Sequence, residues 1–328
     1  MALKITHENL ADFADRVVNL EPKVAAEKRE QVNLLRDRLK SHISANPGFS
    51  LVKMLHAGSV AKRTALRTVN DFDVAVYVRR DKAPGDETEL VAWMTDRLRE
   101  AYKGVLDPSQ ITPGTHCVNV YFKSSGTEVD VVPVLYEGDA DDRGYLISKD
   151  ATDRTEWLLT SVRLHLDFIK DRRDAVPDDW AQVVRLVKWW TREQRLATPG
   201  GTFRLKSFMI ELLCAHLQDT GRIDCTDYVA ALDGVFDYIV RTGLRERIAF
   251  NDFYSASALP KDRVDPIEIF DPANPGNNTA RKCLDQDRVQ IVDAAEAALD
   301  AITEASFATT KDQAVKCWQV VLGSKFRG

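Results

Sequence analysis

A β-rich run from Asp71 to Val78, with the sequence DFDVAVYV, begins with two acidic residues one position apart. Valine, phenylalanine and tyrosine favour extended backbone, so the run is predicted to be a strand. Side chains alternate between the two faces of a strand, so Asp71 and Asp73 are predicted to share one face. Any sheet that contains this strand therefore places two carboxylates side by side.

A third carboxylate lies in a later pair of β-rich runs. His116–Phe122 and Glu128–Val134 are joined by a short polar segment with a glycine, which predicts a hairpin. Asp130, in the second run, is expected to meet Asp71 and Asp73 from a neighbouring position in the same sheet. Two unit charges about 4 Å apart repel by about 4 kcal/mol at an effective dielectric near 20, so such a group requires a counter-ion.

Ligands that are all oxygen favour Mg²⁺, with Mn²⁺ as the alternative cofactor. Two such ions about 3.5 to 4 Å apart activate an attacking hydroxyl and stabilise the leaving group in phosphoryl transfer. Asp71 and Asp73 are predicted to bridge two ions, and Asp130 to bind the ion nearest the attacking oxygen. The three aspartates are thus the predicted catalytic and metal-binding residues.

A candidate phosphate site precedes the acidic strand. Gly58 and Ser59 follow a predicted strand, Phe49–Leu55, and open a short predicted helix near Val60–Ala65. Glycine lets backbone amides approach a phosphate closely, and a helix N-terminus favours an anion. Gly58 and Ser59 are therefore predicted to bind the triphosphate of a nucleotide.

The predicted elements divide the chain near Thr160. Residues 1–160 combine the strands with helices over Pro22–Ile43 and Leu90–Tyr102, which predicts an α/β (α+β) unit with a mixed sheet. Residues 161–328 are predicted to form a mainly helical lobe, with the active site in the cleft between the lobes. The helices predicted near and beyond the boundary are Leu158–Lys170, Asp179–Gln194, Ser207–Gln218, Asp227–Arg241 and Gln286–Ser306. Asn278 is expected to cap the last of these helices.

Composition excludes several classes of protein. A net charge of -5 argues against a protein that coats nucleic acid, because phosphate neutralisation needs an excess of Lys and Arg. The N-terminal residues carry acids and no continuous apolar run, and no other stretch is long and apolar enough for a membrane span. The five cysteines form no CxxC pair, which favours reduced thiols and a cytoplasmic protein.

The order Gly-Ser, short helix, Asp-x-Asp and later Asp resembles the DNA polymerase β-like nucleotidyltransferases. The likeness extends over nearly the whole chain through the segments GSVAKRTALRTVNDFDVAVYV, EVDVVPV, QVVRLVKWW, KSFMIELL and FDPANPGNN. Within that superfamily the chain is most similar to the bacterial cGAS/DncV-like nucleotidyltransferases (CD-NTases) of anti-phage CBASS systems, in particular the HORMA-associated, clade-C-like enzymes.

This resemblance implies a polymerase β-like core and a helical lobe similar to the C-terminal domain of oligoadenylate synthetase. It also implies synthesis of a cyclic oligonucleotide second messenger from ATP or other NTPs, with cyclic triadenylate as the expected product. The implied partner is a HORMA-domain activator, with nucleic acid as a candidate co-activator and no membrane.

The resemblance further implies that Lys188 and Ser207 contact the triphosphate from the helical lobe. Lys188 lies on a predicted helix with Arg185, Arg192 and Arg195 at intervals of three, four and three residues. This spacing predicts a cationic stripe that offsets polyphosphate charge. Trp189 and Trp190, on the same predominantly apolar helix, are predicted to pack in the core.

Two other functions remain open on the residues alone. A linear transferase that adds a nucleotide to RNA or another acceptor would use the same three carboxylates. A non-catalytic nucleotide-binding scaffold would keep the fold without the reaction, although the intact aspartate trio argues against it. Product analysis with nucleotides alone distinguishes cyclisation from linear transfer, and pyrophosphate release distinguishes catalysis from binding.

Overall fold

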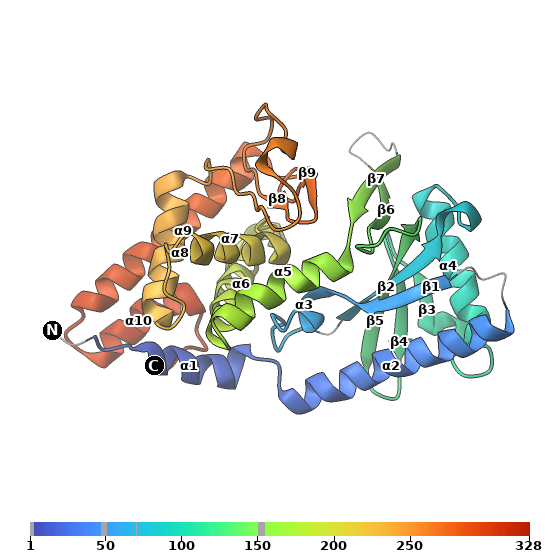
Figure 1. Cartoon of the computed structure of the whole chain (residues 1–328). Coiled ribbons are helices and arrows are strands. Elements are labelled where there is room, and N and C mark those ends of the chain that lie inside the picture. The colour runs from blue at the N-terminus through green and yellow to red at the C-terminus, as the bar shows by residue number, and fades with distance from the viewer. Residues whose placement is uncertain (1–2, 47–50, 70, 150–154) are drawn as a thin grey trace. The chain divides into compact units, whose positions relative to one another are not determined.

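The computed structural model describes residues 3–46, 51–69, 71–149 and 155–328. These residues form two compact units, which are drawn together in Figure 1. The α/β unit contains Leu20–Arg63 and Thr68–Asp167, and the helical unit contains the chain before Leu20, Thr64–Arg67 and Phe168–Gly328. The predicted α/β class, with a mixed sheet and a mainly helical second part, is confirmed.

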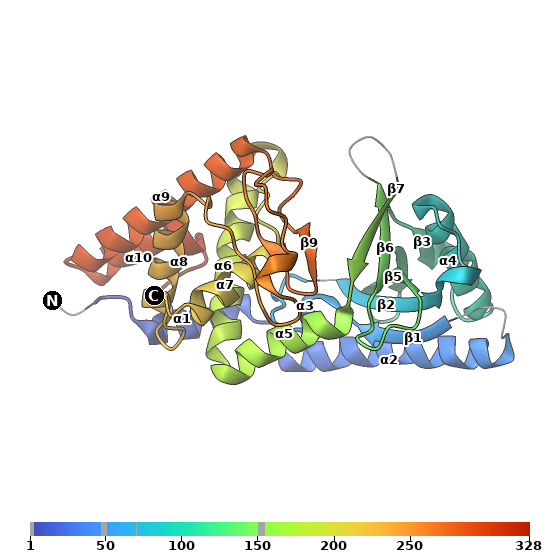
Figure 2. The same ribbon diagram turned by 45° about the horizontal axis from the view of Figure 1, so that its top comes forward.

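The sheet of the α/β unit is mixed because β2 and β5 pair in parallel, while the other pairings among its described strands are antiparallel. The strand order is β1-β2-β5-β4-β3, and β6 joins β5 and carries β7 (Figure 2). The predicted β4–β5 hairpin is confirmed. The strands are β1 Leu51–His56, β2 Asp71–Arg79, β3 Ile111–Pro113, β4 Val118–Phe122, β5 Thr127–Tyr136, β6 Gly144–Lys149 and β7 Thr155–Thr160.

Two long helices pack on this sheet. Helix α2, Pro22–Ala45, buries an apolar stripe of Val32, Leu35 and Leu39, which are three or four residues apart, and contacts β1, β2 and β5. Helix α4, Glu87–Ala101, begins at the Asp86 cap, whose carboxylate accepts hydrogen bonds from two backbone N–H groups of the first turn. Both helices agree with the prediction, because each presents one apolar face to the strands.

The helical unit is built around a core of large aromatic side chains. Trp189 and Trp190 are almost fully buried, as predicted, and the Trp189 indole N–H donates to the carbonyl oxygen of Leu322 at 2.8 Å. None of the described helices is long and apolar enough to cross a bilayer. The elements of the helical unit are α1 His7–Phe13, a π-helical turn Ala14–Val18, most of α5 Val162–Ala175, α6 Asp179–Ala197, α7 Ser207–Asp219, α8 Tyr228–Thr242, the hairpin β8 Phe270–Asp271 and β9 Asn274–Asn278, α9 Asp285–Phe307 and α10 Lys311–Leu322.

Two local predictions for this half of the chain are wrong. Leu158 is not helical but lies in β7, and the helix begins only at Val162. Asn278 does not cap a helix, because it ends β9 and its side-chain amide donates to the carboxylate of Asp265 and the carbonyl oxygen of Ile267. In both cases a pairing with a neighbouring strand or loop outweighs the local sequence signal.

A short segment between helix α3, Gly58–Ala61, and β2 packs with the helical unit. The backbone N–H of Arg67 donates to the carbonyl oxygen of Val18 at 2.7 Å, and its guanidinium Nε donates to that of Asn19 at 3.0 Å. Thr64, at the start of this segment, is completely buried. The chain therefore enters the helical unit for four residues, Thr64–Arg67, before it returns to form β2.

Thr64 is held by a buried ion pair. The Lys188 ammonium donates to Glu211 Oε1 at 2.7 Å, to Thr64 Oγ1 at 2.9 Å and to the Thr64 carbonyl oxygen at 3.2 Å. Both charged side chains are buried, with 4% and 2% of their surface exposed. Thr64 Oγ1 also donates to Glu211 at 2.6 Å. Loss of either charge would leave the other buried without its counter-ion.

We expect Glu211→Ala to lower the free energy of unfolding by about 3 to 5 kcal/mol, the usual cost of breaking a buried ion pair. Asp237→Ala is the matched control, because Asp237 pairs with Arg241 on an exposed face of α8 and should contribute less than about 1 kcal/mol. Urea denaturation of both variants measures the two values. Equal, small losses would contradict the assigned role of the buried pair.

Candidate active site

The centre of the candidate site is a row of polar residues across three strands. Asp73 of β2 lies directly opposite Asp130 of β5, and Asp130 lies directly opposite Asn119 of β4. Residues opposite one another on adjacent strands project from the same face of a sheet, so the three residues form one row. The predicted meeting of Asp73 and Asp130 is thus present in the strand register.

Asp71 occupies the position two residues before Asp73 in β2, opposite Glu128 of β5. Its backbone is described, but its side chain is outside the described part of the chain. The predicted role of the Asp71 carboxylate therefore stays a prediction. Its place in the register is the one that the period of two requires for an aspartate on the same face as Asp73.

Asp130 is contacted by two residues that the sequence did not single out. The side-chain amide of Asn119 donates to Asp130 Oδ1 at 2.5 Å. Cys117, two residues before Asn119 in the chain, is partly buried beside the carboxylate of Asp130. Burial, reinforced by the negative charges of Asp130 and Asp73, raises the pKa of the Cys117 thiol to about 11. The thiol is therefore neutral at physiological pH, next to two acidic groups.

Gly58 brings backbone against this row. It starts helix α3, Gly58–Ala61, with φ of 67°, which is a left-handed conformation that favours glycine. A Cβ atom on Gly58 would lie 1.7 Å from Asp73 Oδ2, so no other residue fits without displacing the carboxylate. The adjoining Ala57 N–H donates to the Asp73 carbonyl oxygen at 2.8 Å. The structure thus places the Gly58-Ser59 turn directly beside Asp73, and α3 ends four residues before the end predicted for this helix.

The helical unit holds the other two predicted nucleotide-binding residues. Ser207 is exposed at the first position of α7. Lys188 is buried, and its ammonium group donates hydrogen bonds to Thr64 and Glu211. A contact between Lys188 and a phosphate would require exchange of these bonds. The triphosphate role of both residues stays a prediction.

The predicted cationic stripe on this helix is not an open face. Arg185 donates to Asn19 Oδ1 and Gln182 Oε1, each at 2.8 Å, and its burial lowers the pKa of the guanidinium. Arg192 pairs with the adjacent Glu193. With Lys188 buried as well, three of the four predicted cations have partners within the helical unit, and the fourth, Arg195, is exposed.

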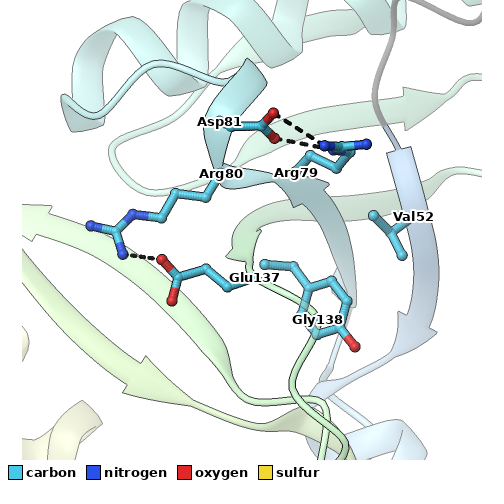
Figure 3. A pocket seen from close by; sticks show the side chains of 7 residues that line it. Val52, Arg79, Arg80, Asp81, Glu137 and Gly138 are labelled. Carbon is cyan, nitrogen blue, oxygen red and sulfur yellow. Dashed lines mark hydrogen bonds and ion pairs between the residues drawn. The ribbon is translucent and has the colours of Figure 1, made fainter.

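A pocket of about 690 Å³ lies at the opposite ends of β2 and β5 (Figure 3). Arg79 pairs with Asp81 through two contacts of 3.1 Å, and Arg80 pairs with Glu137. The charged side chains that line the pocket are therefore paired with one another. Arg79 follows Asp73 by six positions in the strand, which corresponds to about 20 Å. This pocket is therefore separate from the carboxylate row.

The donor chemistry of the row fits a hard divalent cation. Asp73 and Asp130 supply carboxylate oxygens, which Mg²⁺ and Mn²⁺ prefer, and the amide of Asn119 orients one of them. Within the described residues no three His, Cys, Asp or Glu side chains form a metal-binding group. The third predicted ligand, the Asp71 carboxylate, lies outside the described side chains.

The Gly58 turn against Asp73 and the facing Asp130 on the parallel strand match the arrangement predicted for a nucleotidyltransferase site. The family model for the Second Messenger Oligonucleotide or Dinucleotide Synthetase (SMODS) domain matches residues 5–172. The chain therefore belongs to this family and is a nucleotidyltransferase that makes an oligonucleotide second messenger. Enzymes of this kind are generally metal-dependent. The predicted family and enzyme class are confirmed.

Individual relatives cover the whole chain. It is 47% identical to the cyclic AMP-AMP-AMP synthase of Escherichia coli strain MS 115-1 over 99% of this chain and 98% of that protein. It is 27% identical to the CBASS oligonucleotide cyclase CdnC of Escherichia coli strain KTE188, with the same coverage.

Solved structures are also similar to this chain over nearly its whole length. CdnC of E. coli MS115-1, solved with ATP and in a complex with HORMA-deltaN, superimposes with a TM-score of 0.92 at 46% identity, over 99% of this chain and at least 99% of CdnC. Vibrio cholerae DncV, with a TM-score of 0.67 at 12% identity over 98% of this chain and 96% of DncV, shares the fold.

We expect Gly58→Ala to abolish nucleotide transfer, because its methyl group would occupy the position of the Asp73 carboxylate. Gly126→Ala is the matched control, since Gly126 has φ of 64° and no atom within 4 Å of the added Cβ. Both variants incur the backbone strain of a left-handed residue, about 1 to 2 kcal/mol, and only the first meets Asp73. Turnover and circular dichroism of both variants measure this. Equal activity losses would show that strain alone is responsible.

Proposed function

We propose that this enzyme condenses ATP into cyclic triadenylate in CBASS anti-phage signalling. The observation that carries the proposal is the opposed pair Asp73 and Asp130 with the Gly58 turn packed against it. The specific product is supported by the 47% identical relative, which is named a cyclic AMP-AMP-AMP synthase. ATP as the substrate is consistent with the predicted cytoplasmic location.

In the proposed mechanism, Asp71, Asp73 and Asp130 would hold two Mg²⁺ ions, or Mn²⁺ in their place. When bound, such ions stabilise the charge on the transferring phosphate and lower the pKa of the attacking hydroxyl. The Gly58 turn packs against Asp73. We therefore assign Asp130 to the side of the attacking hydroxyl, where it helps to accept the proton of that hydroxyl.

The Gly58-Ser59 turn serves the donor triphosphate in this proposal. Because Gly58 has no side chain, the backbone beside Asp73 stays accessible to phosphate oxygens, and the Ser59 hydroxyl adds a donor. Lys188 and Ser207 of the helical unit remain the proposed further contacts of the triphosphate. Each transfer forms one phosphodiester bond and releases pyrophosphate, and closure of the ring repeats the step within one linear intermediate.

We expect Asp73→Asn and Asp130→Asn each to reduce turnover about a thousandfold or more, because a neutral amide removes several kcal/mol of transition-state stabilisation. Asp96→Asn, an exposed position on α4 of the same unit, is the control and should keep full activity. Release of pyrophosphate from ATP with Mg²⁺ measures all three. Near-normal turnover of a folded Asp73→Asn protein would refute the assignment of the carboxylates.

A HORMA-domain protein is the proposed activator, because the 46% identical CdnC has been solved in a complex with HORMA-deltaN. We expect the chain, mixed NTPs and Mg²⁺ to yield a phosphatase-resistant product that contains only adenosine, in larger amounts when the HORMA-domain partner is added. Nuclease digestion and mass spectrometry identify the product. A linear product with terminal phosphates would support the linear transferase, and nucleotide binding without pyrophosphate release would support a scaffold.

A further inference from the structure

We propose that Asn119 is a positioning residue that fixes the carboxylate of Asp130 for metal binding. The inference rests on the proposed metal role of Asp130. Asn119 lies directly opposite Asp130 in the β4–β5 ladder, and its amide Nδ2 donates to Asp130 Oδ1 at 2.5 Å. A hydrogen-bond donor on one oxygen restricts rotation of the carboxylate.

The identity of the amide atom that faces Asp130 follows from chemistry. An ionised carboxylate only accepts hydrogen bonds, so the NH₂ end of Asn119 must point at it and the oxygen end away. The oxygen end is packed against backbone: a Cβ on Gly114 would lie 2.9 Å from Asn119 Oδ1. Gly114 is itself held by a hydrogen bond of 2.8 Å from its N–H to the Cys117 carbonyl oxygen.

The Gly114 turn therefore supports Asn119, and Asn119 supports Asp130. Groups that donate to a metal-ligating carboxylate set its orientation, and their loss typically costs 10- to 100-fold in metal affinity or activity. Asn119 is well placed for this task because it lies within β4, directly opposite Asp130 in the β4–β5 ladder. The next residue on the same face of β4, Tyr121, lies opposite Glu128 and is exposed.

The test compares Asn119→Leu, which keeps the volume and removes the donor, with Tyr121→Leu on the same face of β4. Mn²⁺ binding to the full chain with a non-hydrolysable ATP analogue is measured by electron paramagnetic resonance, together with the Mg²⁺ dependence of pyrophosphate release. Asp130→Asn is included as a reference for complete loss of the ligand, and thermal unfolding without metal checks that each variant is folded.

We expect Asn119→Leu to weaken Mn²⁺ binding and raise the half-saturating Mg²⁺ concentration by about 10- to 100-fold, with most activity recovered at high metal concentration. KM for ATP at saturating metal should not change, and Tyr121→Leu should resemble the parent protein. A folded Asn119→Leu protein with unaltered Mn²⁺ binding would overturn the inference. If Asp130→Asn also left Mn²⁺ binding unaltered, the proposed function itself would fail.

Discussion

The candidate site depends on the parallel pairing of β2 with β5. This pairing places Asp73 opposite Asp130, although they are 57 positions apart in the sequence. A slip of one residue would turn Asp130 to the other face of the sheet. The register is held by Val74, Val129 and Val131, which flank the aspartates and are almost fully buried. Burial of one face thus determines which acidic groups meet on the other.

The same pairing explains why the surrounding residues are so constrained. Two carboxylates in one row need a cation between them and a fixed orientation, and the fold supplies neighbours on both sides. Gly58 approaches Asp73 from α3 so closely that a methyl group is excluded, and Asn119 holds Asp130 from β4. The neutral thiol of Cys117 adds no further charge to the row. Each neighbour is fixed by backbone pairing, which limits how far the carboxylates can move.

Local sequence patterns were sufficient for elements whose signal is their own periodicity. The alternation around Asp73 predicted β2 and its shared face, and the apolar stripe predicted helix α2. The paired strands β6 and β7 were missed because polar residues dominate the connection from Glu137 onward, and because β6 depends on pairing with β5 and β7 on pairing with β6. Helix α10 was missed as well, although its buried residues Ala314, Trp318, Val321 and Leu322 lie at helical spacing.

Site residues that depend on distant partners could not be predicted. Lys188 was expected on a cationic surface, yet its burial is determined by Glu211 and Thr64, and the latter lies 124 positions away. Asn119 carried no signal of its own. The hairpin register, once known, identifies it as the residue opposite Asp130. Sequence order revealed the three aspartates, whereas their supporting contacts required the paired strands.

Asp73 and Asp130 are proposed to bind the divalent cations of the reaction. Anomalous diffraction from crystals grown with Mn²⁺ and a non-hydrolysable ATP analogue can test this directly. We expect manganese peaks in contact with carboxylate oxygens of Asp73 and Asp130, with the triphosphate against the Gly58-Ser59 turn. Manganese bound to the nucleotide but to neither aspartate would contradict it.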